Sequence, residues 1–160
     1  MKTILIPTNF TNDSIEVAET IVADANENVN LVFTHLFHVA DDIQDLLFSG
    51  SREREHELIS KDFKEACNIL KENSDEKITT IKIDFFYGNK LASLKNFLEY
   101  HEVDFIAYSG SRGVPKLNKN SLDALPVLKK CGIPLVDTDL ISIDSLSEAS
   151  SVMGDARWLG

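Results

Sequence analysis

The sequence predicts an α/β protein, a single domain in which helices pack on a five-stranded parallel sheet. Five short runs of apolar and β-branched residues recur along the chain, and stretches with the apolar spacing of helices separate them. The 160 residues, 43% of them hydrophobic, can bury one sizeable core. The expected strands are residues 3–7, 30–39, 77–87, 104–108 and 133–137.

The segment after the first strand predicts a helix that packs on the sheet. Thr11 is the expected N-cap, and Asp13 falls in the first turn, where a negative charge favours the helix dipole. Apolar residues then recur on one helical face: Ile15, Ala18, Ile21, Val22 and Ala25.

The second expected helix spans residues 52–72. Its polar side carries Glu57, Lys61 and Glu65 at intervals of four residues, which is typical of a solvated face rather than of a site. Its apolar side consists of Ile59, Phe63, Cys67 and Leu70.

A third helix is expected over residues 90–101, after a turn at residues 88–89. Its inward-facing residues are predicted to be Leu91, Leu94, Phe97 and Leu98.

A fourth helix is expected near residues 122–130, with Leu125 and Leu128 facing inward. Pro126 requires this helix to begin late or with a distorted first turn. Gly132 is the expected end signal, and Pro134 favours an edge strand after it.

Two segments fit this scheme poorly. Residues 40–50 form an apolar loop that could cover a pocket or a partner, and residues 138–160 form a tail that contains Trp158. The predicted organisation is therefore an α/β domain over residues 1–137 and a C-terminal tail over residues 138–160. The tail packs either on its own domain or on a second subunit.

Composition excludes several classes of protein. The formal net charge of −10 argues against binding to nucleic acid. Cys67 and Cys131 share no metal or redox spacing and suit a reducing compartment. The apolar run at the N-terminus is too short for a signal peptide, and no stretch is long enough for a membrane helix. We expect a cytoplasmic protein.

The fourth strand leads directly into a loop that contains Gly110 and Gly113, whose lack of side chains lets backbone N–H groups approach an anion. Arg112, Lys116 and Lys119 follow without an intervening acid. This local positive charge on an acidic protein predicts a phosphate site, although a solvated surface loop would have the same composition.

Four segments in this order resemble the universal stress protein domain: residues 4–11, residues 38–39 at the end of the second strand, residues 103–113 and residues 132–136. The resemblance extends over residues 2–137. It implies a doubly wound fold with helices on both faces of the sheet and strand order 3-2-1-4-5, like that of the adenine nucleotide alpha hydrolases. It also implies a homodimer with the last strand at the seam and a role in the stress response.

Members of that family that bind ATP carry an acid after the first strand, a backbone contact at the end of the second and the motif G-x2-G-x9-G-[ST]. This chain matches the pattern in part, because Asn9 stands where the acid is expected and Asp123 stands where the third glycine is expected. Asn120 and Ser121, with Ser121 capping the fourth helix, could replace the missing half. The candidate binding residues are Pro7, Asn9, Val39, Gly110, Arg112, Gly113, Asn120 and Ser121.

No enzyme motif or metal site emerges from the sequence. His35 and His38 face opposite sides of a regular strand, and no nucleophile elbow, Walker motif or dinucleotide fingerprint is present. Three functions remain open. The first is a dimeric regulatory or interaction module with a degenerate nucleotide site and a possible protein partner. The others are an ATP- or AMP-binding switch and a binder of another anionic metabolite.

Overall fold

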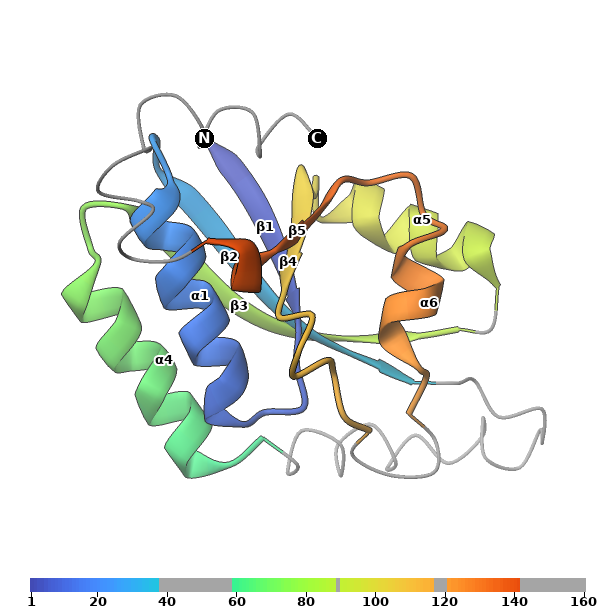
Figure 1. Cartoon of the computed structure of the whole chain (residues 1–160), viewed down its shortest axis with the longest axis horizontal. Coiled ribbons are helices and arrows are strands. Elements are labelled where there is room, and N and C mark those ends of the chain that lie inside the picture. Colours follow the sequence, from blue (N-terminus) through green and yellow to red (C-terminus); the bar gives the residue numbers. More distant parts are fainter. Residues whose placement is uncertain (38–58, 89, 117–120, 142–160) are drawn as a thin grey trace.

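The computed structural model describes residues 1–37, 59–88, 90–116 and 121–141, which form one central sheet between two helical layers (Figure 1). The strands are β1 (Lys2–Pro7), β2 (Val29–Phe37), β3 (Ile78–Tyr87), β4 (Phe105–Tyr108) and β5 (Leu135–Asp137). Every pairing is parallel and the order is β3-β2-β1-β4-β5. The predicted fold class and strand order are both confirmed.

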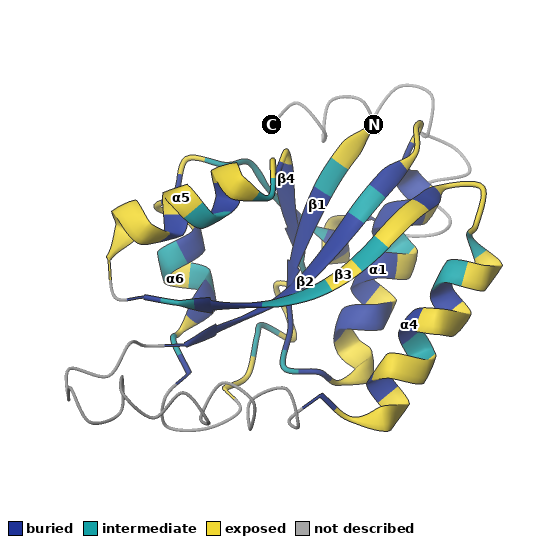
Figure 2. Ribbon diagram, turned by 180° about the vertical axis from the view of Figure 1, so that it is seen from behind, coloured by how far each residue is buried: buried dark blue, intermediate teal, exposed yellow. Residues whose placement is uncertain are grey.

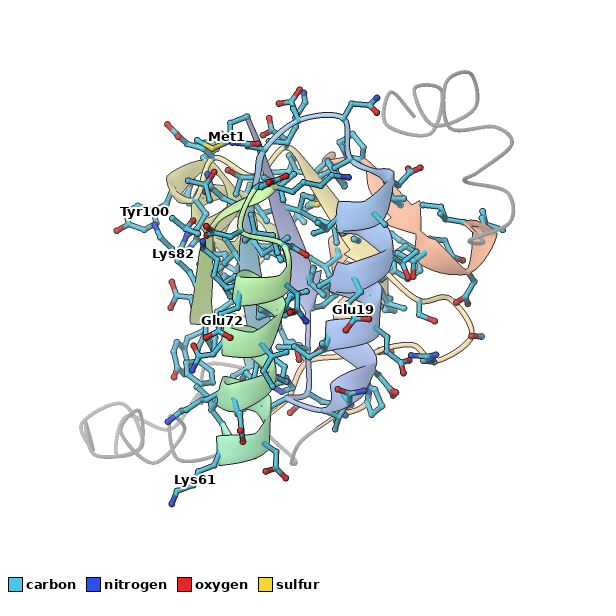
Figure 3. The ribbon with its side chains drawn as sticks, turned by 90° about the vertical axis from the view of Figure 1, so that its left-hand side faces the viewer. Met1, Glu19, Lys61, Glu72, Lys82 and Tyr100 are labelled. Carbon is cyan, nitrogen blue, oxygen red and sulfur yellow. The ribbon has the colours of Figure 1, made fainter. Side chains whose placement is uncertain are left out.

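The helices cover both faces of the sheet, as Figure 1 shows. Helices α1 (Asn12–Asp24) and α4 (Lys61–Asn73) lie side by side on one face, and α5 (Leu91–Tyr100) and α6 (Ala124–Leu128) lie on the other. Glu19, Lys61 and Glu72 point away from the sheet on the outer sides of α1 and α4 (Figure 3). No helix in the described part of the chain is long and apolar enough to cross a membrane.

Each strand divides its side chains between two separate cores, because alternate residues of a strand face opposite sides. In β1, Ile4 and Ile6 pack under α1 and α4, and Leu5 packs under α5 and α6. The central strands are accordingly buried, and exposed residues are concentrated on the outer sides of the helices (Figure 2).

Helices α1 and α4 have the apolar faces that their sequences predict. Thr11 is the N-cap of α1, although its side chain makes no capping hydrogen bond. Helix α4 starts at Lys61, because the Ser60 hydroxyl caps it by accepting from the Phe63 N–H at 3.1 Å. Residues 59–60 are therefore not helical, so the predicted helix over residues 52–72 is wrong at these two positions. Residues 52–58 lie outside the described residues.

Helices α5 and α6 differ from their predictions in detail. Leu91 is 37% exposed and does not face inward, because it begins the first turn of α5. Helix α6 is shorter than predicted, with Pro126 inside its first turn. It buries Ala124 and Leu128, and Leu125 is half-buried.

The two edges of the sheet are β5 and β3. The predicted edge position of the strand after Pro134 is confirmed, and the Pro134 carbonyl accepts a hydrogen bond from the Ile106 N–H. On β3, one carboxylate oxygen of Asp84 accepts from the Phe85 N–H at 2.8 Å, and the other lies 2.8 Å from His101 Nε2.

The first residues after β5 pack against the domain. They form a short 3-10 helix, η1 (Thr138–Leu140), beside α1. The Thr138 hydroxyl donates to the Tyr108 carbonyl, and Ile141 is buried in the core under α1 and α4. The rest of the expected tail, residues 142–160, and the apolar loop at residues 40–50 lie outside the described residues.

Candidate functional site

The strand order places the two loops that the sequence singles out next to each other. Strands β1 and β4 are neighbours at the centre of the sheet, so the loops at their carboxyl ends flank one crevice. A narrow pocket lies between these loops, and the described residues around it leave room for about one water molecule. Its lining includes Pro7, Asn9, Arg112 and Gly113.

The remaining predicted site residues lie elsewhere or outside the described part of the chain. Gly110 belongs to the loop after β4 but does not line the pocket. Ser121 is buried at the end of β2, where it forms an antiparallel bridge with Phe37. Because the N-cap of α6 is Asp123, the prediction that Ser121 caps this helix is wrong. Val39 and Asn120 lie outside the described residues.

A chain of hydrogen bonds fixes the loop after β1. The Phe10 N–H donates to the Thr8 hydroxyl at 2.8 Å, Thr8 donates to the Ser14 hydroxyl at 2.7 Å, and Ser14 donates to the Thr11 carbonyl at 3.0 Å. These bonds hold Phe10 in a left-handed backbone conformation, with φ of 63°, which is uncommon for a residue other than glycine. In the same loop Asn9 accepts a hydrogen bond from the Thr11 hydroxyl at 2.8 Å.

His35 connects this loop to the segment before α6. Its Nδ1 donates to the Thr8 carbonyl at 2.6 Å, so in the neutral ring Nε2 accepts from the Ser121 hydroxyl at 2.7 Å. The ring is buried and packs between Phe10 and Phe37. Burial lowers the pKa of His35, and the hydrogen bond to Thr8 opposes this in part.

In the loop after β4, backbone N–H groups already bind two carboxylates of the chain itself. Gly110 N–H donates to Asp137 Oδ1 at 2.9 Å, and Ser111 N–H donates to Asp139 Oδ2 at 2.6 Å. The other oxygen of Asp139 accepts from the Ser109 hydroxyl at 2.7 Å. The hydrogen bonds from Ser111 and Ser109 lower the pKa of Asp139.

Gly110 has a steric role that follows from this arrangement. A Cβ at this position would lie 2.3 Å from Asp137 Oδ2, so only glycine allows the carboxylate to come so close. Gly113 is different, because a Cβ there would meet nothing within 4 Å, but its φ of +65° disfavours any side chain.

Of the positive charges that the sequence predicts in this segment, that of Arg112 is compensated. Arg112 forms an ion pair with Glu16 and lies 3.6 Å from Asp13, both on α1. The hydrogen bond to Glu16 raises the pKa of the guanidinium. Lys116 is exposed, and Lys119 lies outside the described residues.

These contacts test whether the loop fits the phosphates of a nucleotide. The successive N–H groups form an anion-binding nest, but Asp137 and Asp139 take the positions that phosphate oxygens would need. The described residues therefore do not fit a triphosphate at this loop. Among all the residues that the structure describes, no cluster of three or more His, Cys, Asp or Glu residues is placed to hold a metal ion.

Sequence reasoning missed Asp137, Asp139 and the connecting role of His35. A signal for the two acids exists, since Asp137 ends the fifth strand and Asp139 comes two residues later, so both lie at the same end of the sheet as the glycine loop. For His35 the signal is a polar residue within an apolar strand. Neither pattern names the partner, which lies far away in the sequence.

The fold and the crevice define a doubly wound α/β protein with its candidate site at the ends of the central strands. The universal stress protein UspA from Lactobacillus plantarum has a similar structure, with a TM-score of 0.52 and 13% identity over 85% of this chain and 96% of that one. The hypothetical protein PH0823 is also similar, with a TM-score of 0.52 and 17% identity over 84% of this chain and 92% of that one. The chain therefore has a UspA-like fold, as the resemblance implies.

No protein-family model matches the sequence, and no curated protein matches it either.

Proposed function

We propose that this protein is a non-catalytic regulatory or interaction module on a UspA-like fold, and that it works without a nucleoside triphosphate in its central crevice. One observation supports the proposal above the others. The N–H groups of Gly110 and Ser111, the donors that a phosphate would need, bind Asp137 and Asp139. A phosphate group that entered the loop would also be repelled by the negative charge of these two acids.

The proposed module acts as a homodimer, contacts a protein partner and takes part in a stress response. The resemblance to universal stress proteins motivates each of these points. Sedimentation velocity at micromolar concentration tests the first of them, with a dimer as the expected result. A monomer at 100 μM would contradict the dimeric form of the proposal.

The alternative function is a switch that binds ATP or AMP, and one observation favours it. Pro7, Asn9, Arg112 and Gly113 line a single narrow pocket, so the loop expected to contact a base lies next to the loop expected to contact phosphates. Another anionic metabolite could use the same residues.

Calorimetric titration of Mg²⁺-ATP into the full chain distinguishes these functions, together with a native mass spectrum that detects carried-over nucleotide. We expect no carried-over ligand and no binding tighter than about 100 μM, which corresponds to roughly 5.5 kcal/mol. Adenosine serves as the control for recognition of the base alone. Binding of ATP tighter than about 100 μM would contradict the proposal. Displacement of that ATP by adenosine would then favour the switch, and ATP binding that adenosine does not displace would favour another anionic ligand.

A further inference from the structure

We propose that Asp137 and Asp139 are the resident anions of the loop at residues 109–113, and that they exclude phosphate-bearing ligands from it. Replacing both residues then turns the loop into a binding site for a phosphate-type anion. This inference rests on the proposed function and extends it, because it names the ligand class that the loop recognises and the residues that block it.

The loop binds anions in this structure, since its donors already hold carboxylates. Gly110 and Ser111 present successive N–H groups to Asp137 Oδ1 at 2.9 Å and to Asp139 Oδ2 at 2.6 Å. The hydroxyl of Ser109 adds a third donor at 2.7 Å. Such an arrangement of successive backbone donors recognises negative charge regardless of which group carries it.

The shape of the loop is matched to Asp137. The space that a Cβ of Gly110 would fill lies 2.3 Å from Asp137 Oδ2 and 3.1 Å from its carboxyl carbon. The same space would admit an oxygen of a phosphate if the carboxylate were absent. The space that a side chain at position 110 would need is thus occupied by the carboxylate of Asp137.

The two aspartates have a large advantage over any dissolved anion because the fold holds them in place. Strand β5 pairs with β4 so that Asp137 lies opposite Tyr108, directly before the loop, and η1 presents Asp139. A tethered group competes at an effective concentration in the millimolar range or above. A free phosphate of similar intrinsic affinity for the donors therefore does not displace it at lower concentration.

The charges around the loop also disfavour the binding of a free anion. Asp13 and Glu16 compensate Arg112, and Asp137 and Asp139 add two more negative charges. Without these two aspartates, two negative charges next to the N–H groups are lost, and the described acids Asp13 and Glu16 are still paired with Arg112, so much of the repulsion of an incoming anion is removed.

The experiment measures binding of inorganic pyrophosphate to the full chain from the amide signals of Gly110 and Ser111 in ¹H–¹⁵N spectra. The double variant Asp137→Ala with Asp139→Ala is compared with the wild type. We expect saturable shifts of both signals in the variant and an affinity at least tenfold higher than that of the wild type. The control is Asp62→Ala with Asp75→Ala, which removes two exposed negative charges from α4 and the residues just after it and leaves the loop intact.

Further variants keep the proposal testable if the double variant does not fold. Asp139→Ala alone retains the contact between Asp137 and Gly110, so pyrophosphate should shift the Ser111 signal and leave the Gly110 signal nearly unchanged. The conservative pair Asp137→Asn with Asp139→Asn keeps oxygen acceptors in the loop and should bind at least tenfold more weakly than the alanine pair.

The outcomes separate this inference from the proposed function. The inference is wrong if folded alanine variants show no saturable shift at these two amides, or if the charge control binds pyrophosphate equally well. In both cases the proposed function stands as long as the wild type does not bind Mg²⁺-ATP. If the wild type itself binds pyrophosphate at the loop with the affinity of the variant, the two aspartates do not exclude phosphates and both proposals fail.

Discussion

The two loops at the centre of the sheet keep their shape by different means. The loop after β1 relies on buried neutral groups, in which Thr8, Ser14 and His35 exchange hydrogen bonds away from water. The loop after β4 relies on charged groups near the surface, in which Asp137, Asp139 and Arg112 hold their partners. Buried neutral bonds resist salt but are costly to leave unmade, whereas exposed charged contacts are screened by salt. This difference predicts which substitutions and which pH values destabilise each loop.

The largest effect is expected from His35→Ala in the buried loop. The change removes a ring that packs between Phe10 and Phe37, and it leaves the Thr8 carbonyl without its His35 donor. We expect a loss of about 2–4 kcal/mol in the free energy of unfolding. Urea unfolding followed by circular dichroism measures it.

The control for this change is Thr20→Ala, because the Thr20 hydroxyl is exposed and donates only to the Glu16 carbonyl of its own helix. A loss for His35→Ala that is no larger than that of the control would show that the buried hydrogen bonds do not stabilise the loop after β1.

An intermediate effect is expected from Gly110→Ala in the charged loop. The new Cβ would meet Asp137 Oδ2 at 2.3 Å, so we expect a loss of about 1–3 kcal/mol. Adding Asp137→Ala should restore most of this loss, because the clash disappears. The same urea unfolding, arranged as a double-mutant cycle, measures the coupling.

Gly113→Ala is the matched control for this cycle. It should cost about 1–2 kcal/mol through its left-handed backbone, and Asp137→Ala should not relieve that cost. Equal relief of both glycine variants would contradict the specific contact between Gly110 and Asp137.

The smallest effect is expected from pH, and it separates the two loops. The folded-state pKa of His35 is lowered, so its contribution to stability is complete above its unfolded pKa of about 6.5 and decreases as the pH falls below that value. The loss is limited, because a charged His35 can still donate to Thr8 and, after the hydroxyl rotates, to Ser121. The folded-state pKa of Asp139 is also lowered, so its contribution decreases only as the pH falls below about 3.9.

Thermal unfolding between pH 3 and pH 8 checks this order of events. His35→Gln should flatten the stability curve between pH 5 and pH 7, and Asp139→Asn should flatten it below pH 4. A His35→Gln curve that is parallel to the wild type between pH 5 and pH 7 would exclude His35 as the origin of the first loss.

Local patterns predicted the framework of this fold well. The apolar residues of α1 and α4 recur at helical spacing, and packing on the sheet buries the residues that this spacing selects. The strand order came from the resemblance to a known family rather than from periodicity. The start of α4 was missed because the cap hydrogen bond of Ser60, and not the length of the apolar pattern, sets the boundary.

The candidate site was harder to predict, because its decisive contacts join distant parts of the chain. Gly110 and Asp137 are 27 residues apart in the sequence, and His35 and Ser121 are 86 residues apart. The glycine spacing predicts a phosphate site, and that site stays a prediction; in the structure the N–H groups of Gly110 and Ser111 bind carboxylates. The spacing did not reveal that the chain supplies these carboxylates itself.

The carboxylate of Asp84 on the outer strand β3 has a consequence for the behaviour of the protein in concentrated solution. An edge strand of ten residues offers a template on which other chains can add strands and aggregate. Asp84 takes the N–H of Phe85 and contacts His101, and the exposed Lys82 places a charge two residues before it (Figure 3). A foreign strand would have to displace the carboxylate and bury the lysine charge. The carboxylate and the lysine charge therefore make pairing with a foreign strand unfavourable along this part of β3.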